Sequence, residues 1–104
     1  MSYDLAILGG LVVDGTGLPR RRADVGIRDG RIVEVGRLSS TDGARVIEAD
    51  GLVVAPGIVD PHTHYDPQLT FDPYATSSCF HGVTSVVAGN CGFSVAPART
   101  RDRE

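Results

Sequence analysis

The 104-residue chain contains no lysine and no tryptophan, and it has only two cysteines. The two cysteines form no CxxC pair and provide no disulfide framework. All ten basic residues are arginine and the formal net charge is −3. The charge therefore gives no electrostatic basis for binding nucleic acid or an anionic membrane surface. We attribute the lack of lysine to genome composition rather than to function.

Long hydrophobic runs are also missing, and no segment approaches the ~20 apolar residues of a membrane span. Leu5–Val13 has the length of the apolar part of a signal peptide, but no Lys or Arg precedes it and Asp4 and Asp14 flank it. Without an export signal we expect a cytoplasmic protein, in which a reducing environment keeps thiols free. No GxGxxG or P-loop fingerprint is present, so no nucleotide site is predicted.

What the chain does contain is typical of a globular protein with many turns. Hydrophobic residues make up 41% of the chain and charged residues 22%, which argues against disorder. Thirteen glycines and six prolines fit a turn-rich β region. The basic run Arg20–Arg22 is predicted to be a solvated loop.

Residues 1–55 carry a β pattern and are expected to form a small antiparallel layer. The clearest feature is a hairpin between Val25–Arg28 and Arg31–Val35, because its connection is the turn dipeptide Asp29-Gly30. Two short strands are expected on either side of a hinge at Gly9-Gly10, and two more on either side of a turn at Asp50-Gly51. These four predicted strands are Leu5–Leu8, Leu11–Val13, Val46–Ala49 and Leu52–Val54.

After Pro56 the pattern changes to strand, connector, strand. Gly57–Asp60 and Val83–Ala88 are short, apolar and rich in β-branched residues, as in buried strands. A helix is predicted over Pro73–Phe80, with Asp72 as its N-cap and Gly82 as its stop signal. A strand–helix–strand unit implies parallel pairing with a right-handed crossover.

Candidate metal ligands follow both of these strands. His62 and His64 come after the first, and Cys91 comes after the second. Alternation along an extended chain directs both histidines to one side and Thr63 to the other. Parallel pairing would bring two imidazoles and a thiol to one edge of the sheet, and these are preferred zinc donors. The alternatives are an exposed loop for the histidines and simple packing for the cysteine.

Other polar residues near these motifs have weaker signals. Asp60 could orient an imidazole or could bind the backbone. Cys79 is predicted to pack on the helix, and His81 to cap the helix carbonyls. Arg99 could pair with a substrate carboxylate, although a surface role is favoured. Pro61 is unusual beside a central strand and suggests that the ladder is distorted where the ligands begin.

The length of the chain limits the fold. A metal-binding (β/α)8 barrel needs about 250 residues. The charged stretch Arg99–Glu104 has the pattern of a helix that begins but does not end. We therefore expect an N-terminal piece of a larger enzyme.

The segment Pro56–His64 resembles the first barrel strand of the amidohydrolase superfamily, in which an HxH pair binds metal. Tyr65–Pro73 and His81–Pro97 resemble more specifically the N-acyl-D-amino-acid deacylases (D-aminoacylases), and the GNCGF sequence after HGVT is the narrowest element of this similarity. Residues 1–55 are similar to the first strands of the β-sandwich of that family.

This resemblance implies an α/β fold with an N-terminal β layer. Residues 1–55 would be part of a composite β-sandwich, and residues 56–104 the first strand–helix–strand unit of a barrel that is incomplete in this chain. In the family, a zinc-bound water attacks the acyl carbonyl of a small N-acyl-D-amino acid. The resemblance assigns Zn²⁺ ligation to His62, His64 and Cys91.

The remaining roles lie around or beyond these ligands. The catalytic aspartate of the family and two further histidines are expected after Glu104, so no catalytic residue is predicted within the chain. Four residues near the ligands are predicted, weakly, to contact the substrate: Tyr65, Asp66, Phe93 and Ser94.

Two other functions compete with deacylation. An amidohydrolase acting on cyclic amides, similar to dihydroorotase or dihydropyrimidinase, would use a bridging lysine in place of Cys91. A truncated fragment with no catalytic role is the other alternative. The chain alone is expected to be inactive and poorly stable, because it would need the missing C-terminal barrel segment.

Overall fold

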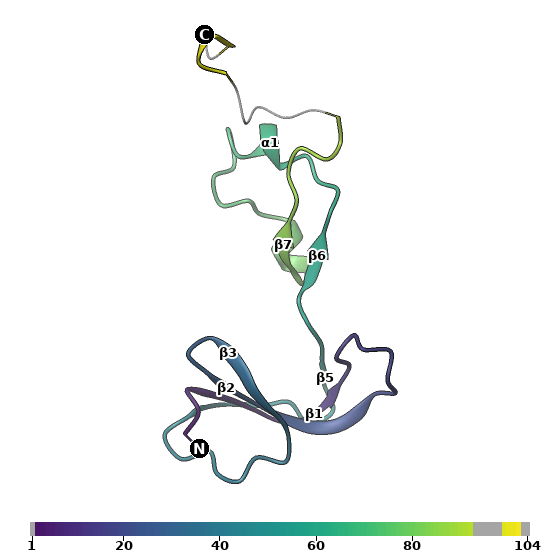
Figure 1. Cartoon of the computed structure of the whole chain (residues 1–104), viewed down its shortest axis with the longest axis vertical. Coiled ribbons are helices and arrows are strands. Elements are labelled where there is room, and N and C mark those ends of the chain that lie inside the picture. The colour runs from purple at the N-terminus through teal and green to yellow at the C-terminus, as the bar shows by residue number, and fades with distance from the viewer. Residues whose placement is uncertain (1, 93–98, 103–104) are drawn as a thin grey trace. The chain divides into compact units, whose positions relative to one another are not determined.

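A computed structural model describes residues 2–92 and 99–102 of the chain (Figure 1). The chain divides into two compact units, Met1–Pro56 and Gly57–Glu104. In the described residues, no helix is long and apolar enough to cross a membrane.

The first unit is a five-stranded mixed sheet. Strand β1 pairs antiparallel with β2, and β2 pairs antiparallel with β3. The prediction of an entirely antiparallel layer is wrong, because β4 and β5 both pair with β1 in the parallel direction. The reason is that the loop after β3 brings the chain back beside Leu5, at the start of β1, so that β4 runs in the same direction as β1. The strands are β1 (Leu5–Val12), β2 (Arg21–Arg28), β3 (Arg31–Gly36), β4 (Arg45–Glu48) and β5 (Val53–Val54).

The predicted hinge at Gly9-Gly10 is a bulge within one continuous strand. The register of β1 against β2 shifts between Ile7 and Gly10, and Gly9 has a φ of +68°. The Gly9 N–H donates to Asp24 Oδ1 at 2.8 Å. On the other edge of β1, β4 pairs before the bulge and β5 pairs after it, which explains why the turn at Asp50-Gly51 separates two short strands.

The hairpin at Asp29-Gly30 is confirmed. Both residues have positive φ, +52° and +69°, as a two-residue hairpin turn of the primed type requires. The predicted loop at Arg20–Arg22 is wrong for Arg21 and Arg22, since both lie in β2. They form ion pairs with Asp14 and Asp50, respectively.

The core of the first unit is small. Tyr3 is 3% exposed, and its hydroxyl donates a hydrogen bond to the Glu34 carboxylate. That hydrogen bond, together with burial and the negative charge of Glu34, raises the pKa of Tyr3. The buried apolar residues of this unit are Tyr3, Ala6, Val12, Val25 and Ala49.

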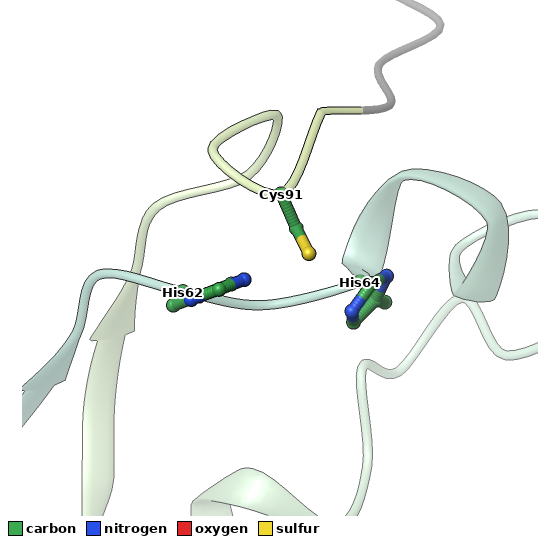
Figure 2. Close-up of side chains that lie close together, drawn as sticks. All are labelled: His62, His64 and Cys91. Carbon is green, nitrogen blue, oxygen red and sulfur yellow. The ribbon is translucent and has the colours of Figure 1, made fainter.

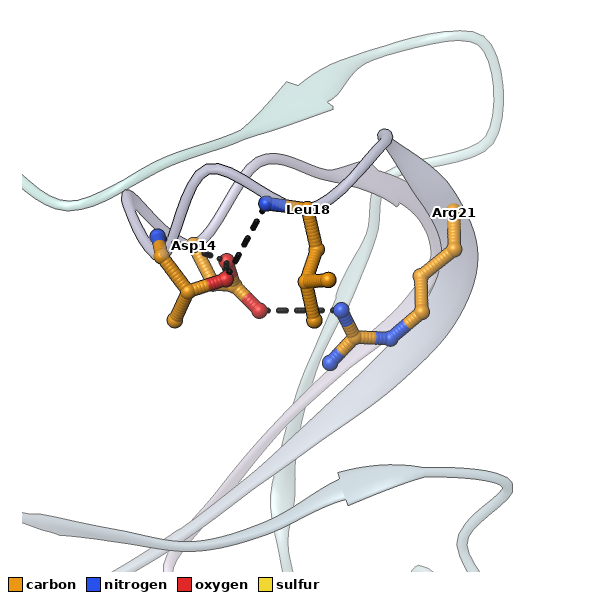
Figure 3. A network of polar contacts seen from close by, with 4 residues as sticks. Asp14, Leu18 and Arg21 are labelled. Carbon is orange, nitrogen blue, oxygen red and sulfur yellow. Dashed lines mark hydrogen bonds and ion pairs between the residues drawn. The ribbon is translucent and has the colours of Figure 1, made fainter.

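The loop between β1 and β2 is organised around Asp14 (Figure 3). Its Oδ1 accepts hydrogen bonds from Thr16 Oγ1 at 2.6 Å and Thr16 N at 3.1 Å, and its Oδ2 accepts one from Arg21 Nη1 at 2.9 Å. The Thr16 hydroxyl is the largest cause, followed by Arg21, of a lowered pKa for Asp14, well below its usual value of 3.8. The carboxylate therefore stays ionised in the folded protein under acidic conditions.

Asp14→Asn is expected to lower the melting temperature by a few degrees at neutral pH. A carboxyl whose pKa is lower in the folded state stabilises that state above its unfolded pKa, and this contribution is lost as the pH falls through the folded pKa. The gap between the wild-type and variant melting temperatures should therefore narrow as the pH falls from about 5 to about 2. Asp42→Asn, in another exposed loop, is the control. A gap that does not change over this range would contradict the prediction.

The second unit contains a parallel strand pair, as predicted. Strand β6 (Ile58–Asp60) pairs with β7 (Val83–Val86), in a register that places Ile58 opposite Val83 and Asp60 opposite Val86. The long connection between them contains a single-turn helix, α1 (Tyr65–Gln68), and a 3₁₀ turn, Ser78–His81.

The predicted helix over Pro73–Phe80 is wrong. Asp72 does not cap a helix, because its carboxylate closes a turn by accepting hydrogen bonds from Thr76 N at 2.8 Å and Thr76 Oγ1 at 2.6 Å. Ala75 and Ser77 then have positive φ, +50° and +76°, which a right-handed helix does not allow. The predicted stop at Gly82 is correct, since it ends the 3₁₀ turn with a φ of +82°.

Candidate metal centre

The candidate ligands begin where the parallel strands end. Strand β6 ends at Asp60 and β7 ends at Val86, and these two residues are opposite one another. One further bond of the ladder, from Val87 N to Asp60 O at 2.9 Å, closes the pair. The residues that follow the two strands therefore begin at the same edge of the two-stranded sheet.

The segment after β6 turns before it reaches the histidines. Asp60 Oδ1 accepts a hydrogen bond from His62 N at 3.0 Å, so of its two predicted roles Asp60 performs the backbone one. His62 and His64 are exposed, whereas Thr63 between them is only 7% exposed. The predicted alternation is therefore retained even though the segment has left the strand.

Cys91 reaches the histidines from a loop after β7. The backbone turns at Gly89, which has a φ of +81°, and Cys91 follows half-buried. Figure 2 shows the sulfur of Cys91 directed toward the space between His62 and His64. The two imidazole rings have centroids 6.2 Å apart and are tilted by 35°.

The three side chains form a cluster that fits a zinc ion. One ligand atom from each of His62, His64 and Cys91 lies within 4.8 Å of the others. Around a tetrahedral zinc such donors would be roughly 3.3–3.6 Å apart, so small side-chain rotations would close the cluster. Two imidazoles and a thiolate suit zinc in particular. Among the described residues, no other group of three or more His, Cys, Asp or Glu side chains could hold a metal ion.

The structure describes two of the four residues that were predicted to contact the substrate. Tyr65 is buried, and its hydroxyl donates to the carbonyls of Ala75 and Thr76, both at 3.2 Å. Asp66 is buried and accepts a hydrogen bond from Gly89 N at 2.8 Å. Substrate contact by these residues stays a prediction, as it does for Phe93 and Ser94, which lie outside the described residues.

Three weaker expectations concern residues away from the ligands. Cys79 is exposed, so the prediction that it packs on a helix is wrong. His81 lies in the last turn of the 3₁₀ segment and is exposed. Arg99 is exposed, in agreement with a surface position.

Sequence reasoning missed two polar residues beside the ligands. Thr63 Oγ1 donates to Val87 O at 3.0 Å, and Asn90 Nδ2 donates to Pro61 O at 2.7 Å. Both lie next to a ligand in the sequence, and this adjacency was the only signal that could have identified them. The loops that follow a parallel strand pair thus bring two imidazoles and a thiol together, and hydrogen bonds join these loops, so the described residues provide a donor set for a metal ion.

Comparison with known proteins gives the family. The model of the "Amidohydrolase family" matches residues 45–102. An N-acyl-D-glutamate deacylase of Alcaligenes xylosoxydans xylosoxydans is 52% identical over 95 residues, which cover 91% of this chain and 20% of that protein. A D-aminoacylase of the same organism is 46% identical over the same shares. The chain belongs to the amidohydrolase family and, within it, to the D-aminoacylase group.

A solved structure supports the same assignment. The N-acyl-D-glutamate deacylase of Bordetella bronchiseptica, complexed with zinc and a phosphonate inhibitor, superposes with a TM-score of 0.83 at 43% identity. The match covers all of this chain and 22% of that one. The chain thus spans about a fifth of the length of the relatives it matches.

Proposed function

We propose that this chain is the N-terminal part of a zinc-dependent enzyme that hydrolyses the amide bond of N-acyl-D-amino acids. The observation that carries the proposal is the convergence of His62, His64 and Cys91 from two parallel strand ends, with ligand atoms within 4.8 Å. The similarity to deacylases of D-amino acids supports the choice of substrate class.

The three side chains have separate roles in this proposal. His62 and His64 would bind the ion through neutral imidazole nitrogens, and Cys91 would bind it as a thiolate whose negative charge offsets part of the charge of the ion. Zinc would supply Lewis-acid activation of water and polarisation of the acyl carbonyl. The exposure of both histidines leaves their side of the cluster open to a small substrate.

We also propose that residues 1–55 belong to a β-sandwich and residues 56–104 to the first unit of a (β/α)8 barrel. The parallel pairing of β6 and β7 supports the second assignment. Both units carry large apolar side chains with high exposure, among them Ile32 at 66% and Phe71 at 76%. Such surfaces need cover from further chain. A general-base aspartate and the remaining ligands would lie after Glu104, in a cytoplasmic protein.

A direct assay tests the proposal. The full-length enzyme with zinc is expected to release free amino acid from N-acetyl-D-glutamate or another N-acetyl-D-amino acid, and not from the L-enantiomer. The 104-residue chain with zinc is expected to give no turnover, because three ligands without a general base cannot complete the hydrolysis. Hydrolysis of a cyclic amide instead of the linear substrates would contradict the proposed substrate class. Turnover by the short chain at a normal enzymatic rate would contradict its incompleteness.

A further inference from the structure

The metal ligands are not held by the β ladder itself. All three lie beyond the ends of β6 and β7, in the histidine segment (residues 61–66) and the cysteine loop (residues 87–91). A loop outside the ladder needs other contacts to keep a fixed position. The position of the cysteine relative to the two histidines therefore depends on contacts between these two segments.

Three hydrogen bonds provide such contacts, and each joins the histidine segment to the cysteine loop. Thr63 Oγ1 donates to Val87 O at 3.0 Å, and Gly89 N donates to Asp66 Oδ2 at 2.8 Å. Asn90 Nδ2 donates to Pro61 O at 2.7 Å. The bonds run in both directions between the segments, so the two segments hold one another.

The positions of these bonds relative to the ligands are informative. Thr63 lies between the two histidines, and Asn90 immediately precedes Cys91 while its acceptor, Pro61, immediately precedes His62. Each bond therefore acts within two residues of a ligand. Their spacing leaves little freedom for the cysteine to move away from the imidazoles.

The side chains that make these three hydrogen bonds differ in burial, and the bonds are expected to differ in strength. Thr63 is 7% exposed and Asp66 is 9% exposed, whereas Asn90 is exposed. A hydrogen bond from a backbone N–H to a buried carboxylate is stronger than one between neutral groups. Its removal also leaves the N–H of the half-buried Gly89 without that partner. Asp66 is for this reason the main support of the cysteine loop.

We propose that Thr63, Asp66 and Asn90 are positioning residues, which lock the cysteine loop onto the histidine segment and thereby preset the metal ligands. The inference rests on the proposed zinc site and assigns to Asp66 a role in the architecture of that site. Residues that orient metal ligands contribute to affinity without touching the ion.

The test measures metal affinity rather than activity. Cobalt(II) occupies nitrogen and sulfur sites, and a cobalt–thiolate bond gives a charge-transfer absorption band. In the full-length protein, Asp66→Ala is expected to weaken cobalt binding by about 10- to 100-fold, as for other residues that orient metal ligands. Asp66→Asn keeps an acceptor oxygen for Gly89 N and is expected to recover most of the affinity. The melting temperature of each metal-free variant is measured beside its cobalt affinity. A residue that acts on stability alone would change the melting temperature without a matching change in cobalt affinity.

Two further variants control for folding. Asp24→Ala removes a carboxylate that likewise accepts backbone hydrogen bonds, from Gly9 N and Leu38 N, but in the unit without metal ligands. It is expected to lower the melting temperature and leave cobalt affinity unchanged. Asn90→Ala removes an exposed side chain, so it should fold even if Asp66→Ala does not, and it should still weaken cobalt binding.

The outcomes separate the inference from the proposed function. Absence of the charge-transfer band in the wild-type protein, or its persistence in Cys91→Ala, would refute the zinc site itself. A wild-type band that depends on Cys91, with unchanged cobalt affinity in both Asp66→Ala and Asn90→Ala, would refute only the positioning role. Weakened affinity in these variants, with rescue by Asp66→Asn and none of the effect in Asp24→Ala, would support it.

Discussion

If the proposed zinc site is present, Cys91→Ser is expected to remove most of the zinc from the full-length protein, and with it the proposed deacylase activity. The cause is chemical, because a neutral hydroxyl is a far weaker zinc donor than a thiolate. The fold should survive the substitution, since Cys91 is a half-buried residue at the end of a loop and not part of either core.

Metal analysis of purified protein, together with the assay on N-acetyl-D-amino acids, measures both effects. Cys79→Ser is the matched control, because Cys79 is exposed and lies outside the ligand cluster. It should keep its zinc and its activity. Full zinc occupancy in Cys91→Ser would show that the cysteine only packs in its loop, and the choice among amidohydrolases would be open again.

Gly26→Ala is expected to destabilise the first unit strongly, although it adds only one methyl group. A Cβ at this position would lie 2.5 Å from Cε1 and 2.7 Å from Cδ1 of Tyr3. The ring is 3% exposed and cannot move into solvent without breaking its hydrogen bond to Glu34. Overpacking of this kind costs about 1–3 kcal/mol.

Thermal unfolding of wild type and variant measures the effect. Gly36→Ala is the matched control, since it lies in β3 and a Cβ there would meet nothing within 4 Å. The control should melt within a degree or two of the wild type, whereas Gly26→Ala should melt clearly lower. Equal melting temperatures for the two variants would show that the Tyr3 ring is not a fixed part of the core.

Features that depend on local chemistry could be predicted from the sequence. The hairpin at Asp29-Gly30 follows from two residues that tolerate positive φ between two β-branched runs. The convergence of His62, His64 and Cys91 follows from parallel pairing, which brings the ends of consecutive strands to one edge. The first inference needs only neighbouring residues, and the second needs only the order of the two strands and the direction of their pairing.

Features that depend on competition between partners could not be predicted in this way. The directions of β4 and β5 are set by the shared partner β1, which local patterns do not reveal. Asp72 and Gly82 are good boundary signals for a helix. The Asp72 carboxylate instead accepts hydrogen bonds from the backbone N–H and the hydroxyl of Thr76, which close a turn. The roles of Thr63 and Asn90 appear only once both loops are placed together.

The central position of β1 has a consequence for the order in which the first unit assembles. Ribosomal synthesis releases β1 first, but its partners β4 and β5 on one edge come from residues 45–54. The hairpin of β2 and β3 closes over two residues and needs no distant segment. Its closure therefore costs less conformational entropy than the pairing of β1 with β4 and β5. One edge of β1 therefore stays at least partly unpaired until Val54 has left the ribosome, and during this interval the nascent chain is open to pairing with another chain.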